Sequence, residues 1–221
     1  MGVWAEVAAF SSVCRYAGRM EQPPVFREMV DWDSAPEHIL GRLAAVPRRW
    51  RVIGVTGRVG AGKSTLARRI GGVVLSTDDY LPDYEGLDPQ VRDDPRHADL
   101  QLLARNVEQL RSGAATEVPV WSFQTHRREG TRVVEASSLI VIEGIHALHG
   151  SVAQLLDCAV FVEASETTRW SRWEAIELAG LRGWGVDKAR AHFERVAEPT
   201  FARFEEEYRR AAHVVVRNEG R

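Results

Sequence analysis

The sequence predicts an α/β fold in which a parallel sheet carries helices on both of its faces. Short apolar runs rich in β-branched residues alternate along the chain with segments that have helical spacing. Strands that are apolar throughout are typical of parallel sheets buried on both faces. A length of 221 residues with 44% hydrophobic content allows one such domain with a sizeable core.

Local patterns predict each element in turn. Ser34 as N-cap, Pro36 in the first turn and Glu37 just after it predict a helix that ends near Ala45. Strands are expected at 51–56, 73–76, 138–142, 159–162 and 213–216. Further helices are expected at 64–70, 99–111, 152–156, 167–181 and 186–197. A hairpin is expected at 118–123 and 131–134, and a long loop at 81–96.

These elements suggest how the chain is divided. Residues 1–35, which Pro23 and Pro24 interrupt, are predicted to be an N-terminal extension with little part in the chemistry. Residues 36–221 are predicted to form the main domain. Within it we expect a small β-hairpin lobe at about 117–135 and a helical lid at about 167–190.

Composition narrows the classes of partner. A net charge of −2 gives no overall basic field, so a nucleic-acid partner is not expected. The chain shows neither a segment as long as a membrane span nor a basic signal-peptide start, so no membrane partner is expected. Cys14 and Cys158 lack metal-ligand spacing and are predicted to be reduced thiols, which favours a cytoplasmic location.

A glycine-rich run between the strand 51–56 and the helix 64–70 predicts a phosphate-binding loop, and with it a P-loop NTPase fold. The run is Gly57, Arg58, Val59, Gly60, Ala61, Gly62, Lys63, Ser64 and Thr65. Its glycines let backbone N–H groups turn toward phosphates, and the helix N-terminus adds partial positive charge. Lys63 can reach the β- and γ-phosphates, and the Ser64 hydroxyl can ligate Mg²⁺. Only two of the 29 basic residues are lysines, and one of them, Lys63, stands at the position where the motif requires lysine. This disfavours a chance match.

Two acidic residues end neighbouring predicted strands. Asp78 follows the strand 73–76 and Glu143 follows the strand 138–142. Ligands of open α/β sheets collect at the carboxyl ends of strands, so both acids are expected near the phosphate loop. Asp78 can accept a proton from an attacking hydroxyl and help to hold the metal, and Glu143 can bind Mg²⁺ directly or through water. Asp79 is an alternative to Asp78, and either site could be a turn or helix cap instead.

The motifs, in this order, resemble those of the uridine kinase and phosphoribulokinase family. The resemblance covers about residues 51–216 and rests on 57–65, 75–80, 93–95, 118–126 and 142–145. The hairpin segment is nearest to uridine–cytidine kinases, whereas Asp78-Asp79-Tyr80 is nearer to phosphoribulokinases. The resemblance implies a kinase that uses ATP (or GTP) and Mg²⁺ to phosphorylate a hydroxyl of a small molecule. A pyrimidine ribonucleoside 5′-hydroxyl is the leading acceptor.

The resemblance also implies roles for acceptor-site residues. It makes Asp78 the general base and places the adjacent Tyr80 in the substrate site. Asp93 matches an acid that binds ribose hydroxyls, as a carboxylate can accept two hydrogen bonds from a diol. Trp121 matches an aromatic near the base, Phe123 an adjacent wall and His126 a base-reading donor. Trp121 and Phe123 could instead pack a hairpin face, and His126 could be a solvated loop residue.

The lid segment departs from the family pattern. Arg169 and Arg172 lie one helical turn apart and could together offset charge on the phosphates, or they could form a solvated helix face. Trp173 stands where uridine kinases have an arginine, and Arg182-Gly183-Trp184-Gly185 replaces a more basic turn. The acceptor could therefore be a sugar phosphate, pantothenate or nicotinamide riboside, and a nucleotide-binding module without an acceptor stays open. Kinases of this family are often oligomeric, so a homo-oligomer is possible.

Overall fold

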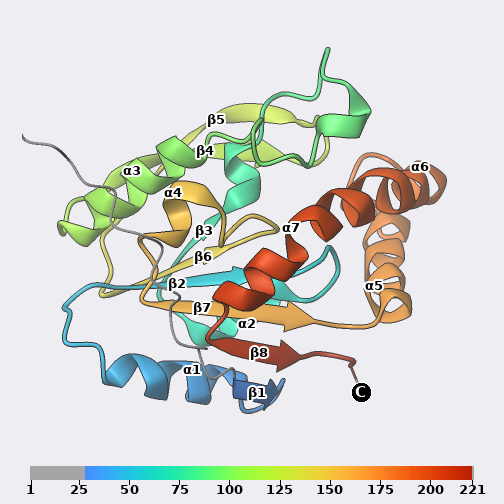
Figure 1. The fold of residues 1–221 in the computed structure, drawn as a ribbon. Coiled ribbons are helices and arrows are strands. Elements are labelled where there is room, and N and C mark those ends of the chain that lie inside the picture. Colours follow the sequence, from blue (N-terminus) through green and yellow to red (C-terminus); the bar gives the residue numbers. More distant parts are fainter. Residues whose placement is uncertain (1–27, 221) are drawn as a thin grey trace, which may run out of the picture.

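Six parallel strands form the central sheet in a computed structural model that describes residues 28–220 (Figure 1). Across the sheet they are β1 (Glu28–Asp31), β8 (Val214–Arg217), β7 (Cys158–Glu163), β2 (Arg51–Thr56), β6 (Leu139–Glu143) and β3 (Val73–Ser76). Because every neighbouring pair is parallel, the carboxyl ends of β2, β3 and β6 share one edge. The predicted parallel sheet and its P-loop strand are confirmed.

Two helices cover one face of the sheet. They are α1 (Ala35–Ala44) and α2 (Lys63–Ile70). Ile39 of α1 and Leu66 of α2 are fully buried in a core with Ile53, Val141 and Val160 of the strands. Burial of this many branched apolar side chains fixes α2, and therefore the loop in front of it, against β2.

The opposite face carries three helices. They are α3 (Leu100–Arg111), α4 (Gly150–Ala153) and α7 (Glu198–Ala211). Leu103 of α3 packs on one half of this face with Ile140 and Ile142, and Phe201 of α7 packs on the other half with Phe161. Because the strands are apolar on both sides, both faces of the sheet must be covered, and helices cover both.

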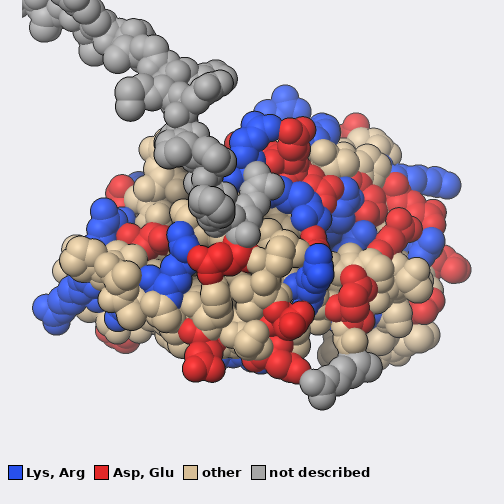
Figure 2. All heavy atoms as spheres, turned by 60° about the horizontal axis from the view of Figure 1, so that its bottom comes forward, with Lys and Arg blue, Asp and Glu red and all other residues tan. Residues whose placement is uncertain are grey.

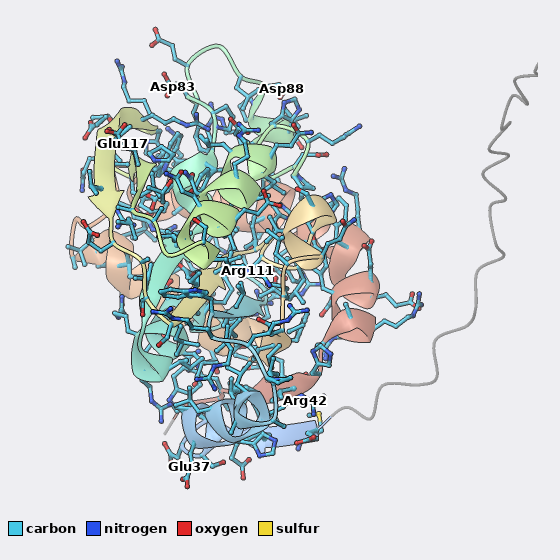
Figure 3. All side chains as sticks on the ribbon, turned by 90° about the vertical axis from the view of Figure 1, so that its left-hand side faces the viewer. Glu37, Arg42, Asp83, Asp88, Arg111 and Glu117 are labelled. Atoms are coloured by element: carbon cyan, nitrogen blue, oxygen red, sulfur yellow. The ribbon has the colours of Figure 1, made fainter. Side chains whose placement is uncertain are left out.

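The hairpin lobe and the lid stand beyond the carboxyl edge of the sheet. The hairpin consists of β4 (Thr116–Ser122) and β5 (Arg127–Val134), paired antiparallel with a bulge between Pro119 and Trp121. The lid consists of α5 (Glu166–Leu178) and α6 (Val186–His192). A π-helical turn at Phe193–Ala197 joins α6 directly to α7. Figure 3 shows the loop with Asp83 and Asp88 and the hairpin residue Glu117 at the end of the molecule opposite α1.

Two elements differ from the sequence-based expectation. The predicted extension 1–35 contains β1, which pairs with β8 and adds an edge strand to the sheet, so the sheet starts before residue 36. Helix α7 was not expected; the helix predicted at 186–197 ends just before Pro199, a residue that disfavours the interior of a helix. Pro199 lies in the first turn of α7, where its missing N–H costs little, and the π turn accommodates it. Residues 1–27, with Cys14, lie outside the described residues.

The surface carries both signs of charge. On the face drawn in Figure 2, basic and acidic side chains are interspersed rather than gathered by sign. Among residues 28–220, no helix is both long enough and apolar enough to cross a membrane. Figure 3 likewise shows acidic Glu37 and basic Arg42 on the same helix, α1.

A buried amide on α3 joins the hairpin strand β4 to Tyr80, and its loss tests that connection. Asn106 Nδ2 donates to Thr116 Oγ1 (2.7 Å) and to the Glu117 carbonyl (3.0 Å), while its oxygen accepts from the Tyr80 hydroxyl (2.9 Å). We expect Asn106→Leu to lower the free energy of unfolding by about 2–3 kcal/mol, because buried polar groups lose their partners. Urea unfolding measures this. Gln101→Leu on the exposed face of α3 is the control and should change stability by less than about 0.5 kcal/mol. Equal effects of the two variants would contradict the assignment.

Candidate active site

The phosphate-binding loop connects β2 to α2 and depends on three glycines. Gly57, Gly60 and Gly62 have φ values of 148°, 77° and 102°, a region that side chains rarely adopt. A Cβ on Gly57 would lie 2.2 Å from the Val162 carbonyl oxygen, and one on Gly60 would lie 2.3 Å from the Arg169 carbonyl oxygen. The loop is thus closed against β7 and α5, with room for backbone only.

Lys63 and Ser64 begin α2 at the floor of this loop. The Lys63 ammonium is buried and donates to the Arg58 carbonyl at 3.1 Å. Burial lowers the pKa of Lys63, and the carboxylates of Glu143 and Asp78 oppose that effect. Ser64 Oγ donates to Glu143 Oε2 at 3.1 Å. The loop lysine, the loop serine and the acid at the end of β6 therefore meet, as the strand-end argument predicts.

A cavity of about 480 Å³ opens in front of the loop. Three acids line it, namely Asp78 in the short 3₁₀ helix after β3 (Thr77–Tyr80), Glu143 at the end of β6, and Asp93 in the loop before α3. This size is typical of pockets for small ligands. The cavity brings together most of the predicted catalytic and acceptor residues.

The environment of Asp78 suits a proton acceptor. Burial, together with the negative charge of Glu143, raises the pKa of the Asp78 carboxyl to about 6. Arg182 and Lys63 act in the opposite direction. A carboxylate with a pKa near 6 is ionised at neutral pH and is still basic enough to take a proton from a reacting hydroxyl. Asp79 is not an equal alternative, because its carboxylate accepts from the Trp121 backbone N–H and pairs with Arg132 on the hairpin.

The donor set next to the loop fits Mg²⁺. The Ser64 hydroxyl and the Glu143 carboxylate are hard oxygen ligands in contact with each other, and Asp78 lines the same cavity. In the described range 28–220, no cluster of three or more His, Cys, Asp or Glu residues could form an all-protein metal cage. Mg²⁺ takes one or two protein oxygens and completes its shell with phosphate and water, so it suits this open arrangement.

Aromatic rings form the wall of the cavity opposite the loop. Trp121 and Phe123 from the hairpin line it, together with His126 in the hairpin turn and Tyr84 from the long loop. The Tyr84 and Trp121 rings lie 5.0 Å apart. Trp184 of the lid stacks on His126, with ring centroids 4.8 Å apart and an interplanar angle of 7°. Tyr84 and Trp184 were not predicted to be substrate residues. For Trp184 the sequence does carry a signal, because it lies between Gly183 and Gly185 in the lid.

Asp93 is held by the lid helix α6. His192 of α6 donates from Nε2 to Asp93 Oδ2 at 3.2 Å, and both side chains are buried at the cavity wall. Asp94 next to it pairs with Arg203 of α7 at 2.5 Å and with Arg96, which holds the pKa of Asp94 well below its usual range. The acid assigned to ribose hydroxyls therefore lies in the cavity.

Two predicted site residues are placed elsewhere. Tyr80 is fully buried in the core under α3, and its hydroxyl donates to Asn106, so it does not line the cavity. Arg169 is also buried and makes two hydrogen bonds to Glu198 at 2.5 and 2.9 Å. That pair holds α5 to α7 instead of facing the phosphates. Arg58 likewise uses its side chain to bind Glu198 and Glu205, so it contributes to the loop through its backbone.

Three arginines line the cavity, namely Arg68, Arg172 and Arg182. Arg172 lines it and donates to the carbonyls of Gly60 and Ala61 at the back of the loop. Arg182 in the lid turn lines it too, with its guanidinium over the rings of Phe123 (4.3 Å) and Trp173 (5.4 Å). Among the described residues, no carboxylate pairs with Arg182. Its cation is therefore available to anionic oxygens in the cavity. The sequence signal was present, as an arginine directly before Gly183.

The lid turn touches the hairpin directly. The Gly183 N–H donates to the Phe123 carbonyl at 3.1 Å, and Gln124 Nε2 donates to the Gly180 carbonyl at 2.9 Å. A Cβ on Gly183 would lie 2.6 Å from the Gln124 carbonyl oxygen. The two lobes predicted from sequence thus close one side of the cavity together.

The pKa of Asp78 makes the pH dependence a test of its role. Its carboxylate accepts a proton only when ionised, so kcat/KM for the acceptor should fall as the pH drops through about 6 and reach a plateau above it. Asp78→Asn should lower kcat by at least about 100-fold while ATP affinity changes little. Steady-state kinetics and calorimetric ATP titration measure the two quantities. An Asn variant that keeps the wild-type rate and acid limb would exclude Asp78 as the base.

Arg182 faces the cavity and Arg169 pairs with Glu198, so substitution of each should affect a different property of the protein. Arg182→Gln should lower kcat by about 100-fold or more with little change in unfolding free energy, since it removes charge from the cavity. Arg169→Gln should destabilise the fold by about 3–5 kcal/mol, because it leaves Glu198 buried beside one partner fewer. Kinetics and urea unfolding on both variants separate the effects. The reverse pattern would show that Arg169 is the catalytic lid arginine.

Comparison with known proteins agrees with this geometry. The model of the phosphoribulokinase / uridine kinase family matches residues 88–220. The uridine kinase of Clostridium tetani is 28% identical over 179 residues, covering 75% of this chain and 85% of that protein. The phosphoribulokinase of Synechocystis sp. is 30% identical over 176 residues, covering 75% of this chain and 52% of that protein.

A solved structure shows the same fold. It is a protein of Silicibacter sp. TM1040 described as a candidate fructose transport system kinase, with a TM-score of 0.67 and 20% identity over 82% of this chain and 97% of that one. At this identity the likeness concerns the P-loop α/β fold alone. The family match covers more than half of the chain and carries the assignment. The chain belongs to the phosphoribulokinase / uridine kinase family and is an ATP-dependent phosphotransferase that acts on a hydroxyl acceptor.

Proposed function

We propose that the chain transfers the γ-phosphoryl group of ATP to the 5′-hydroxyl of a pyrimidine ribonucleoside. One observation supports this acceptor above others. The proton acceptor Asp78, the diol-binding candidate Asp93 and a wall of aromatic rings line a single cavity next to the phosphate loop. A nucleoside carries the three matching groups, namely a primary hydroxyl, a vicinal diol and a flat base.

The donor binds through the loop. Backbone N–H groups of residues 57–65 and the Lys63 ammonium hold the phosphates. Ser64 and Glu143 would hold Mg²⁺, which would neutralise charge on the phosphates. Arg172 and Arg182 line the space in front of the loop and offset the charge that develops on the transferred group.

Transfer then needs one proton acceptor. The acceptor oxygen forms a bond to the γ-phosphorus as the bond from that phosphorus to the β,γ-bridging oxygen breaks, and ADP leaves with the bonding electrons. The hydroxyl proton passes to the Asp78 carboxylate. The lid and the hairpin, in contact with each other, shield one side of the reacting groups from water, which limits hydrolysis of ATP without an acceptor.

A tryptophan that lines the acceptor pocket has a buried N–H group without a hydrogen-bond partner. Trp121 Nε1 is buried at the cavity wall and has no hydrogen-bond partner among the described residues. A buried donor without a partner costs free energy, so a ligand with an acceptor atom at this place would bind favourably. A pyrimidine base offers carbonyl oxygens that fit, and its ring can stack on neighbouring aromatic side chains.

A sugar or sugar-phosphate acceptor is the second candidate, and one contact favours it. The face of the His126 ring toward Trp184 is already covered by that indole, so a base could not stack there without moving it. A polyol needs no stacking surface and could use Asp78, Asp93 and Arg182 alone. Pantothenate and nicotinamide riboside are further alternatives of the same reaction class.

Location and assembly are part of the proposal. Cys158 is a buried free thiol, and burial raises its pKa to about 11, so it is unreactive. This agrees with a reducing, cytoplasmic compartment. Small-molecule acceptors, and no nucleic acid, are the expected partners, and a homo-oligomer is possible.

An acceptor screen with labelled ATP tests the proposal. Uridine and cytidine should be phosphorylated with higher kcat/KM than ribulose 5-phosphate, fructose, pantothenate or nicotinamide riboside. Asp93→Asn should raise the KM for the nucleoside by about 10-fold or more with a smaller change in ATP affinity, since it removes the charged acceptor of the diol hydrogen bonds. The matched control is Asp88→Asn on the exposed long loop, which should behave as wild type. A preference for a sugar acceptor would replace the first candidate by the second.

A further inference from the structure

Asp93 belongs to a stretch of chain with no regular structure of its own. Residues 92–99, between a 3₁₀ turn (Pro89–Val91) and α3, form neither helix nor strand. A side chain on such a segment is well placed only if contacts from outside the segment hold its backbone, because the backbone of a loop otherwise has many conformations. The contacts of Asp93 with other elements therefore decide how precisely its carboxylate is placed.

Two histidines hold Asp93 at two different points. His192 of α6 donates to the carboxylate oxygen Oδ2. His146, in the turn that follows β6, donates from Nε2 to the Asp93 backbone carbonyl at 2.6 Å. The first contact depends on the lid, whereas the second comes from the body of the sheet. The backbone of Asp93 is thus joined to the turn that starts at Glu143.

The surroundings of His146 specify one form of its imidazole ring. The side chain is buried, and burial lowers its pKa to about 4, so the ring is neutral at physiological pH. A backbone carbonyl only accepts hydrogen bonds, so Nε2 must carry the proton and Nδ1 must be an acceptor. The Tyr208 hydroxyl of α7 lies 3.0 Å from Nδ1 and donates to it. Both ring nitrogens therefore have the partner that this tautomer needs, and the orientation of the ring is fixed.

The turn that carries His146 is itself tied to β2. The Gly144 N–H donates to the Val55 carbonyl at 3.1 Å, and Thr56 Oγ1 donates to the Ile145 carbonyl at 2.9 Å. Val55 and Thr56 are the last two residues of β2 before the phosphate loop. The position of His146 is therefore set relative to that loop.

We propose that His146 is a positioning residue for the acceptor, because it holds the Asp93 backbone at a fixed place relative to the phosphate loop. This inference rests on the proposed role of Asp93 in acceptor binding, and it holds for any acceptor that Asp93 binds. A carboxylate that is already in place loses less conformational entropy when a ligand binds to it. His146 does not line the cavity, so its effect on the reaction passes through Asp93.

A double-mutant cycle tests whether His146 acts through Asp93. Steady-state kinetics use the acceptor with the highest kcat/KM, at a temperature where urea unfolding shows every variant to be folded. We expect His146→Leu to raise the KM for the acceptor by about 10-fold, with kcat and the KM for ATP within about threefold of wild type. In the Asp93→Asn background the same change should raise the acceptor KM by less than about twofold, because the charged group that it positions is gone.

Two further variants separate positioning from a general loss of structure. His146→Gln keeps an N–H donor for the Asp93 carbonyl, so its acceptor KM should lie within about threefold of wild type. His149→Leu is the matched control. The His149 ring packs edge-on against His146, with centroids 6.0 Å apart, and shares its neighbour Tyr208, yet the hydrogen bond to Asp93 belongs to His146. The acceptor KM of His149→Leu should be that of wild type.

The outcomes distinguish this inference from the role of Asp93 on which it rests. A wild-type acceptor KM in His146→Leu, beside a raised KM in Asp93→Asn, would overturn the inference alone. So would a His146→Leu effect of equal size with and without the Asp93 carboxylate. If Asp93→Asn leaves the acceptor KM unchanged, the proposed role of Asp93 fails, and the inference fails with it.

Discussion

The close approach of the glycine loop to two neighbouring backbones is the constraint on which the site depends. Gly57 and Gly60 leave no space for a side chain against Val162 and Arg169, so the loop, β7 and α5 form one rigid unit. Arg58 and Arg169 then share Glu198, which joins this unit to α7. Residues that sequence reasoning would assign to phosphate charge instead hold the loop and the lid in register. Positive charge in the cavity lining comes from Lys63, Arg68, Arg172 and Arg182.

The cavity is lined by both acidic and basic side chains, and burial strengthens the electrostatic interactions between them. The negative charge of Glu143 raises the pKa of the Asp78 carboxyl, and the positive charges of Arg182 and Lys63 lower it. A divalent cation and a polyanionic donor would enter this balanced field together. The same closeness explains why a carboxylate can remain basic beside a phosphate loop. The chemistry of the site therefore depends on the ends of three strands meeting at one edge of the sheet.

Sequence reasoning located the loop, Asp78, Glu143, Asp93 and the hairpin aromatics, because each follows a strand or carries a specific motif. It did not locate α7, since Pro199 looks like a breaker unless the preceding π turn is known. Nor could it distinguish Arg169 from Arg182, because the sequence shows no sign of where Glu198 lies. Tyr80 belongs to a motif, yet a 3₁₀ turn directs its ring into the core and leaves Tyr84 at the cavity. Local turns decided the cases of α7 and Tyr80, and a pairing between distant residues decided the case of Arg169.

The central claim is that donor and acceptor meet in one cavity with Asp78 between them. A crystal structure with a non-hydrolysable ATP analogue, Mg²⁺ and uridine tests this most directly. The account predicts an acceptor hydroxyl within hydrogen-bond distance of the Asp78 carboxylate and facing the γ-phosphate, with the terminal phosphates held by residues 57–65. An acceptor bound outside the cavity, or an Asp78 carboxylate turned away from its hydroxyl, would contradict it.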